Sequence, residues 1–135
     1  MPDLPVTTVI AALLALMALP LSIHVSARRA SIGMKAGVIH AAVFGYADDP
    51  MLRNAIRAFG NFMEYSPLAL IMLGLYELNG APKLTLWWLG GAFVAGRALH
   101  AVAMTFIPKM PAPRGIAMFT TYAALGWPAI AMLLF

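Results

Sequence analysis

The sequence predicts an all-α integral membrane protein, folded as a four-helix bundle in one domain over residues 1–135. Two observations support this fold class. The chain is 62% hydrophobic and only 10% charged, whereas soluble domains carry about 25% charged residues. It contains four apolar segments that each reach the roughly 20 residues needed to cross a bilayer. It has no cysteine, which excludes disulfides, thiolate metal sites and a thiol nucleophile of its own.

The first predicted span covers residues 4–27, which are free of charge apart from a possible His24. The stretch that follows, "RRASIGMKAGVIHAAVFGYADDP", contains several Gly and Ala residues and gives no clear prediction. Any thiol chemistry in this protein would need a thiol supplied by a ligand, because the chain has no cysteine.

The second span, residues 58–79, belongs to a longer predicted helix. It begins at "DDP", with Asp49 as the N-cap and Pro50 at the first helical position. It ends at "NG", where Gly80 can adopt the left-handed cap conformation. Such a helix of about 30 residues is roughly 45 Å long, which exceeds the ~30 Å hydrocarbon core. Part of it should therefore stand in water.

The third and fourth spans are bounded by prolines. The third, residues 84–107, lies between Pro82 and Pro108, and the fourth covers residues 114–135. Glycines of the third span are expected to allow close helix packing. They are Gly90, Gly91 and Gly96.

Basic residues predict the orientation. Two loops, after the first and the third spans, hold nearly all of them: Arg28, Arg29, Lys35, Arg53, Arg57, Lys109 and Arg114. The opposite side offers Lys83. Both basic loops should be cytoplasmic, which places the two termini outside. The net charge of +4 is thus explained by topology, and no nucleic-acid partner is expected.

The second helix carries a polar stripe. At 100° per residue, Arg53, Arg57, Asn61 and Glu64 fall within roughly 80° of one another. Ionisable residues toward hydrocarbon are costly and mark functional sites by default. The stripe therefore makes this helix the first place to look for a binding site.

The third helix carries Arg97, His100 and Met104 on one broad face. Arg97 lies roughly 15 Å in from Ile107, at a depth where it could meet Glu64. One interpretation is a structural Glu64–Arg97 ion pair. The other is a receptacle for anionic groups, because the arginines outnumber the carboxylate and arginine binds carboxylates bidentately.

Arg114 follows Pro113 at the start of the fourth helix, where exposed amides and the helix dipole favour negative charge. A bound thiol there would be stabilised as a thiolate. The alternative is an arginine that only reaches lipid phosphate. His24, His40 and His100 show no metal-ligand spacing, so no metal is expected.

Three motifs resemble one family. "RAFGNFMEYSP" resembles the second-helix pattern of the MAPEG family, the membrane-associated proteins of eicosanoid and glutathione metabolism. "GRALHAVA" is similar to the third helix of its prostaglandin E synthase branch. "VSARRA" is similar to the end of the first helix in its leukotriene-conjugating synthase.

The resemblance implies a homotrimer of four-helix protomers, placed in a bacterial inner membrane, with glutathione bound between neighbouring protomers near the cytoplasmic side. Arg114 would stabilise the glutathione thiolate as the catalytic residue. Glu64 would accept from the amino group, and Arg57 and Arg97 would take carboxylates. The implied glutathione-binding residues are Arg28, Arg57, Asn61, Glu64, Tyr65, Arg97 and His100.

The leading hypothesis is a glutathione transferase or peroxidase acting on lipophilic electrophiles or lipid hydroperoxides. Met104 stands where the eicosanoid synthases have a tyrosine, and Gly115 where the prostaglandin branch has a serine. The family also has a non-enzymatic, lipid-binding member, so a non-catalytic ligand-binding protein is the alternative. A proton-coupled exporter using Glu64 is the third hypothesis, disfavoured by the cations around that carboxylate.

Overall fold

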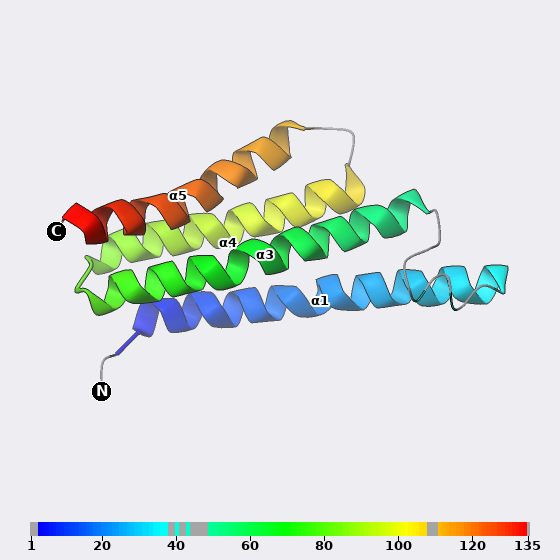
Figure 1. Cartoon of the computed structure of the whole chain (residues 1–135), viewed down its shortest axis with the longest axis horizontal. Coiled ribbons are helices and arrows are strands. Elements are labelled where there is room, and N and C mark those ends of the chain that lie inside the picture. The colour runs from blue at the N-terminus through cyan, green and yellow to red at the C-terminus, as the bar shows by residue number, and fades with distance from the viewer. Residues whose placement is uncertain (1–2, 38–39, 41–42, 44–48, 108–110, 135) are drawn as a thin grey trace.

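The computed structural model describes residues 3–37, 40, 43, 49–107 and 111–134. This part of the chain is helical, with four long helices. They are α1 (Pro5–Ala36), α3 (Pro50–Leu78), α4 (Lys83–Phe106) and α5 (Ala112–Leu134). The helices run lengthwise beside one another, and the chain starts and finishes at the same end of the bundle (Figure 1).

The ends of α3 follow local sequence. The Asp49 carboxylate accepts a 2.6 Å hydrogen bond from the amide of Leu52, and Pro50 occupies the first turn. Gly80 adopts φ = 81° just after the helix. Both predicted boundaries are confirmed. The first helix is longer than its predicted span, because no proline interrupts it after Pro20 and it continues to Ala36.

Helices α1 and α5 each pack on α3 and α4, and within the described residues they do not contact each other. A main core cluster joins all four helices: Val6, Ile10, Leu14, Phe62, Ala69, Leu73, Leu86, Phe93 and Ala124. Close approach depends on two of the predicted glycines. A Cβ at Gly90 would lie 2.7 Å from the Ile10 side chain, and one at Gly96 would clash with Thr120, whereas Gly91 faces open space.

Three helices have the length and composition of membrane spans: α1 over Pro5–Lys35, α4, and α5. Within the described residues, α3 does not meet this criterion. The prediction of four spans therefore holds for three helices by this criterion. Helix α3 falls outside the criterion because Arg57, Asn61 and Glu64 of the polar stripe lower its hydropathy. The helix itself is continuous through residue 78.

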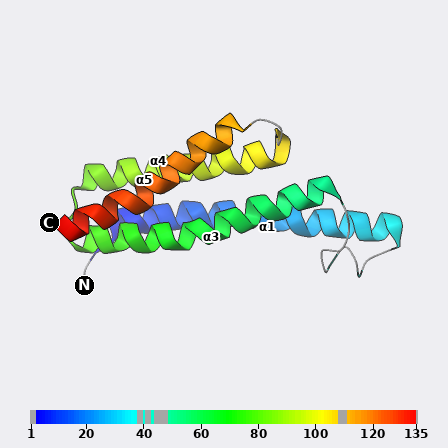
Figure 2. The ribbon, with the colours of Figure 1, turned by 45° about the horizontal axis from the view of Figure 1, so that its top comes forward.

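In Figure 1, helix α5 separates from α3 and α4 toward its own N-terminal end, and the view turned by 45° shows it crossing from the α3 side at its C-terminal end to the α4 side (Figure 2). A residue near the N-terminal end of α5, Arg114, still shares a cavity with residues of α3 and α4. The divergence gives room for polar side chains between the three helices.

Candidate functional site

Three residues of the polar stripe of α3, Arg57, Asn61 and Glu64, line a cavity of about 510 Å³ between α3, α4 and the start of α5, whereas Arg53 is not part of its lining. Spacings of three and four residues bring the stripe to one side of α3, and His100 and Met104 lie one turn apart on α4. The lining residues are Ile56, Arg57, Gly60, Asn61, Glu64, His100, Met104 and Arg114.

A second cavity, of about 380 Å³, adjoins the first. It shares Asn61, His100 and Arg114 with the first and continues along α5 to Met118. Its full lining is Asn61, His100, Pro111, Arg114, Gly115 and Met118. Arg114 lies in the first turn of α5, where the free backbone amides add positive potential to its own charge.

The charges in the cavity do not balance. Arg57 and Arg114 contribute two guanidinium groups, and Glu64 contributes one carboxylate. Within the part of the chain that the structure describes, none of the three makes a hydrogen bond or an ion pair. Arg57 and Glu64 are exposed, and Arg114 is half-buried. The cavity thus holds a surplus positive charge that remains available to an anionic ligand.

Arg97 lies behind this cavity. Its side chain is only 1% exposed. Nη1 donates to Asn61 Oδ1 at 2.9 Å and Nη2 donates to Thr121 Oγ1 at 2.7 Å. The rings of Phe93 and Tyr65 lie 5.5 and 5.6 Å from the guanidinium carbon. Such ring contacts stabilise a buried cation in place of a counter-ion.

This placement separates Arg97 from the residues that line the cavities of a single chain. Arg97 does not line either cavity, so its guanidinium is not positioned to take a ligand carboxylate. The Glu64–Arg97 ion pair, one of the two interpretations of the sequence, is not found among the described residues, because Glu64 is exposed on the cavity side and the Arg97 guanidinium donates to Asn61. Asn61 instead forms the interhelical hydrogen bond with Arg97.

The remaining predicted residues lie outside the cavity. Tyr65 is half-buried with its ring against Arg97. Arg28 is half-buried on α1, which contributes no residue to either cavity lining. A single chain therefore brings together Arg57, Asn61, Glu64, His100 and Arg114.

Sequence reasoning missed Thr121, which is fully buried and holds Arg97 from α5. The available signal was its position seven residues after Arg114, two turns along the same face of the helix. An isolated threonine in an apolar span is otherwise unremarkable, because its hydroxyl can bond the helix backbone.

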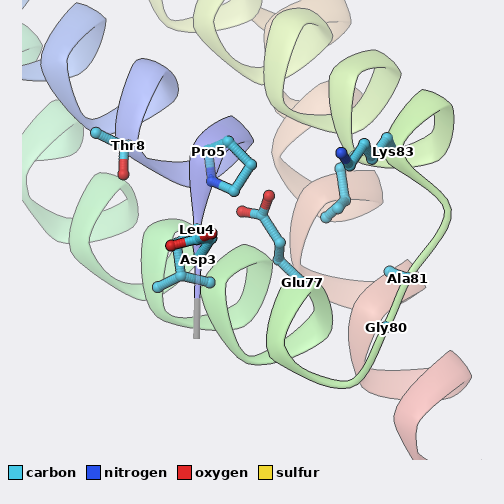
Figure 3. A pocket seen from close by; sticks show the side chains of 9 residues that line it. Asp3, Leu4, Pro5, Thr8, Glu77, Gly80, Ala81 and Lys83 are labelled. Carbon is cyan, nitrogen blue, oxygen red and sulfur yellow. The ribbon is translucent and has the colours of Figure 1, made fainter. Parts of the chain in front are cut away.

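A further cavity, of about 620 Å³, lies at the opposite end of α3, beside Asp3, Glu77 and Lys83 (Figure 3). The Glu77 carboxylate points toward the start of α1 and accepts hydrogen bonds from the amides of Val6 and Thr7, at 2.9 and 2.8 Å. Its oxygens are thus engaged as a cap for α1, which has no side-chain cap of its own at Leu4. No group of three or more His, Asp or Glu residues able to hold a metal ion is found in the described ranges.

Comparison with known proteins identifies the family. The profile of the MAPEG family matches residues 7–134. The chain belongs to the MAPEG family. A 49-residue stretch is 39% identical to the inner membrane protein YecN of Escherichia coli K12, and equally to YecN of Escherichia coli O6:H1. This stretch is 36% of the present chain and spans 37% of the length of each relative. No solved structure matches. Membership in a membrane family and three apolar helices establish an integral membrane protein.

Proposed function

We propose that this MAPEG protein is a glutathione-dependent membrane enzyme, which binds glutathione in the cavity between α3, α4 and α5. It would activate the thiol for transfer to a lipophilic electrophile or for reduction of a lipid hydroperoxide. The observation that carries the proposal is the pair of arginines, Arg57 and Arg114, that face one cavity with Glu64 and have no partner among the described residues. The cavity volume lies within the ~300–1,000 Å³ of small-molecule sites.

The charges of glutathione suit this lining. The tripeptide carries two carboxylates, one ammonium group and a thiol. Glu64 would accept from the ammonium group, and Arg57 would bind a carboxylate through two parallel N–H groups. Asn61 and His100 add neutral polar groups beside them. The buried charge of Arg97 further raises the positive potential at the cavity, which attracts anions.

Arg114 would supply the chemistry. Its guanidinium and the amides at the start of α5 would favour the ionised form of the bound thiol. The thiolate forms a bond to an electrophilic carbon, and the leaving group departs with the electrons of the broken bond. With a hydroperoxide the sulfur takes the outer oxygen, and the alkoxide that leaves takes up a proton. Proximity of the two reactants supplies most of the remaining rate.

A trimer would complete the site. Because the cavity residues Arg57 and Glu64 are exposed in a single chain, this side of the cavity would be available to a neighbouring copy. Arg28 of the partner subunit would then reach the second glutathione carboxylate. We place the protein in a bacterial inner membrane, with α3 as the fourth span and the cavity near the cytoplasmic side, in keeping with the basic residues at that end.

The test is a titration of detergent-purified protein with glutathione, which follows the heat of binding and the ultraviolet absorbance of the thiolate together. Arg114→Ala should retain binding and lose the thiolate band, together with conjugation of an aromatic halide. Lys83→Ala, which removes an exposed cation at the opposite end, is the matched control and should change neither. A full thiolate band in Arg114→Ala would remove Arg114 from the mechanism.

One observation favours a non-catalytic ligand-binding protein of the same family. Met104 and Gly115 line the cavities where the synthases have hydroxyl groups. Arg114 would then stabilise a thiolate without hydrogen bonds from those two hydroxyl groups. This second candidate expects lipid to copurify with the protein and no turnover of either substrate class at saturating glutathione.

A further inference from the structure

A chain of hydrogen bonds runs from the backbone of α5 to the edge of the cavity. The Thr121 hydroxyl donates to the carbonyl of Ala117 at 3.2 Å, which leaves its oxygen free to accept from Arg97 Nη2 at 2.7 Å. Arg97 Nη1 in turn donates to Asn61 Oδ1 at 2.9 Å. Three helices are joined by this chain, and each of its bonds has a fixed direction.

The direction follows from the chemistry of the groups. A backbone carbonyl can only accept, so the single hydroxyl proton of Thr121 is committed to it. A guanidinium can only donate, so the atom of Asn61 that meets Arg97 must be the carbonyl oxygen and not the amide nitrogen. The amide orientation of an asparagine is otherwise ambiguous, and here the buried cation decides it.

Asn61 also lines both cavities. Because the Asn61 oxygen is directed at Arg97, the donors that its side chain can offer to a ligand are the two N–H groups of the amide nitrogen, on the other branch of the side chain. We infer that Thr121 and Arg97 are positioning residues, which hold Asn61 so that it presents N–H donors to the cavity. The inference rests on the proposed function for the identity of the ligand. It adds that the ligand atom bound beside Asn61 is a hydrogen-bond acceptor, namely a carboxylate or carbonyl oxygen.

Burial makes this arrangement rigid. Arg97 is 1% exposed and Thr121 is 0% exposed, so water cannot replace either partner without opening the bundle. The nitrogen Nε of Arg97 is buried without a hydrogen-bond partner in the described structure. If Thr121 or Asn61 is changed, the acceptors that remain in the described structure are the other of these two residues and the weakly accepting sulfur of Met118, 3.9 Å from Nη2. A change at either residue should therefore alter the hydrogen bond at the other.

The experiment separates positioning from packing. Asn61→Asp keeps the oxygen that accepts from Arg97 and adds a charge that pairs with it, but it replaces the donor with an acceptor. Its thermal midpoint should stay within about 2 °C of wild type or rise, while glutathione affinity measured by calorimetry falls about tenfold to a hundredfold, as for a lost hydrogen bond to a charged group.

Thr121→Val should weaken glutathione binding about threefold to tenfold and lower the midpoint by a few degrees. Thr121→Ser, which retains the hydroxyl, should restore both. Thr120→Val is the matched control, because Thr120 donates to the same carbonyl of Ala117 at 2.8 Å and does not bond Arg97. Equal effects of Thr120→Val and Thr121→Val would show a packing effect and overturn the inference, as would wild-type affinity in Asn61→Asp.

If the wild-type protein does not bind glutathione at all, the proposed function fails, and the thermal measurements still decide the inference. A retained midpoint in Asn61→Asp, with loss in Thr121→Val and none in Thr120→Val, supports the Thr121–Arg97–Asn61 chain. A fall of more than about 5 °C in Asn61→Asp shows that Asn61 does not accept from Arg97 and overturns it.

Discussion

Removal of the Glu77 carboxylate should destabilise the protein without any effect on the cavity near Arg114. Glu77 accepts from the amides of Val6 and Thr7 at 2.9 and 2.8 Å, and α1 has no side-chain cap at Leu4. An N-terminal cap contributes about 0.5–2 kcal/mol, and a carboxylate beside the positive end of a helix adds about 0.3–1 kcal/mol.

Glu77 is half-buried, so water can reach the freed amides and the lower part of this range applies. We therefore expect Glu77→Ala to lower the free energy of unfolding by about 1–2 kcal/mol. For a chain of this length the thermal midpoint should fall by about 3–8 °C. Glu77→Gln, which keeps one accepting oxygen, should show about half the loss.

Thermal unfolding in detergent, followed by far-ultraviolet circular dichroism, measures this effect. Asp3→Asn is the control, because Asp3 is an exposed carboxylate beside the same cavity. If Glu77→Ala and Asp3→Asn unfold at the same temperature, the two hydrogen bonds contribute no net stability and the capping argument is wrong.

Three further predictions concern packing, ligand charge and topology. Gly91→Ala should stabilise α4 by about 0.5–1 kcal/mol, because its Cβ would lie in open space. Gly90→Ala should have a free energy of unfolding about 1–3 kcal/mol below that of Gly91→Ala, because its Cβ would overlap the side chain of Ile10 on α1. Equal thermal midpoints of the two variants would contradict the close contact between α1 and α4. Arg57→Ala should weaken glutathione binding about tenfold, as for a lost charge-assisted hydrogen bond, and calorimetry measures it; an unchanged affinity would exclude Arg57 from the site. Because the chain has no cysteine, a membrane-impermeant maleimide applied to spheroplasts should label Asn79→Cys and leave Met51→Cys unlabelled, and the reverse pattern would invert the topology.

The parts of the fold that were predictable are those set by neighbouring residues. Asp49 and Pro50 start α3 through local capping, and Gly80 ends it through its left-handed backbone. The polar stripe was equally accessible, because residues three and four apart on one helix share a face whatever the rest of the chain does. Arg57, Asn61 and Glu64 accordingly line one cavity.

Contacts between helices were not predictable in the same way. Whether Arg97 meets Glu64 or Asn61 depends on the rotation of α4 about its axis and on how closely it approaches α3, which helical periodicity does not determine. The hydrogen bond of Thr121 could not be predicted for the same reason, because its partner Arg97 lies 24 positions away on another helix. Helix α3 does not meet the length-and-hydropathy criterion for a membrane span, because its polar face lowers the hydropathy of the helix.

The buried guanidinium has a consequence for how the protein is made. Ribosomes complete α4 before they reach Thr121, so during synthesis Arg97 enters the translocon without its α5 acceptor. A lone arginine at the centre of a helix costs about 2.5–3.5 kcal/mol on insertion scales. Until α5 is made, α4 should therefore stay near the bilayer surface or insert with Arg97 hydrogen-bonded to Asn61 of α3 alone. Stable insertion of α4 is thereby coupled to the arrival of the last helix, and a nascent chain truncated before residue 112 should be a preferred substrate for membrane quality-control proteases.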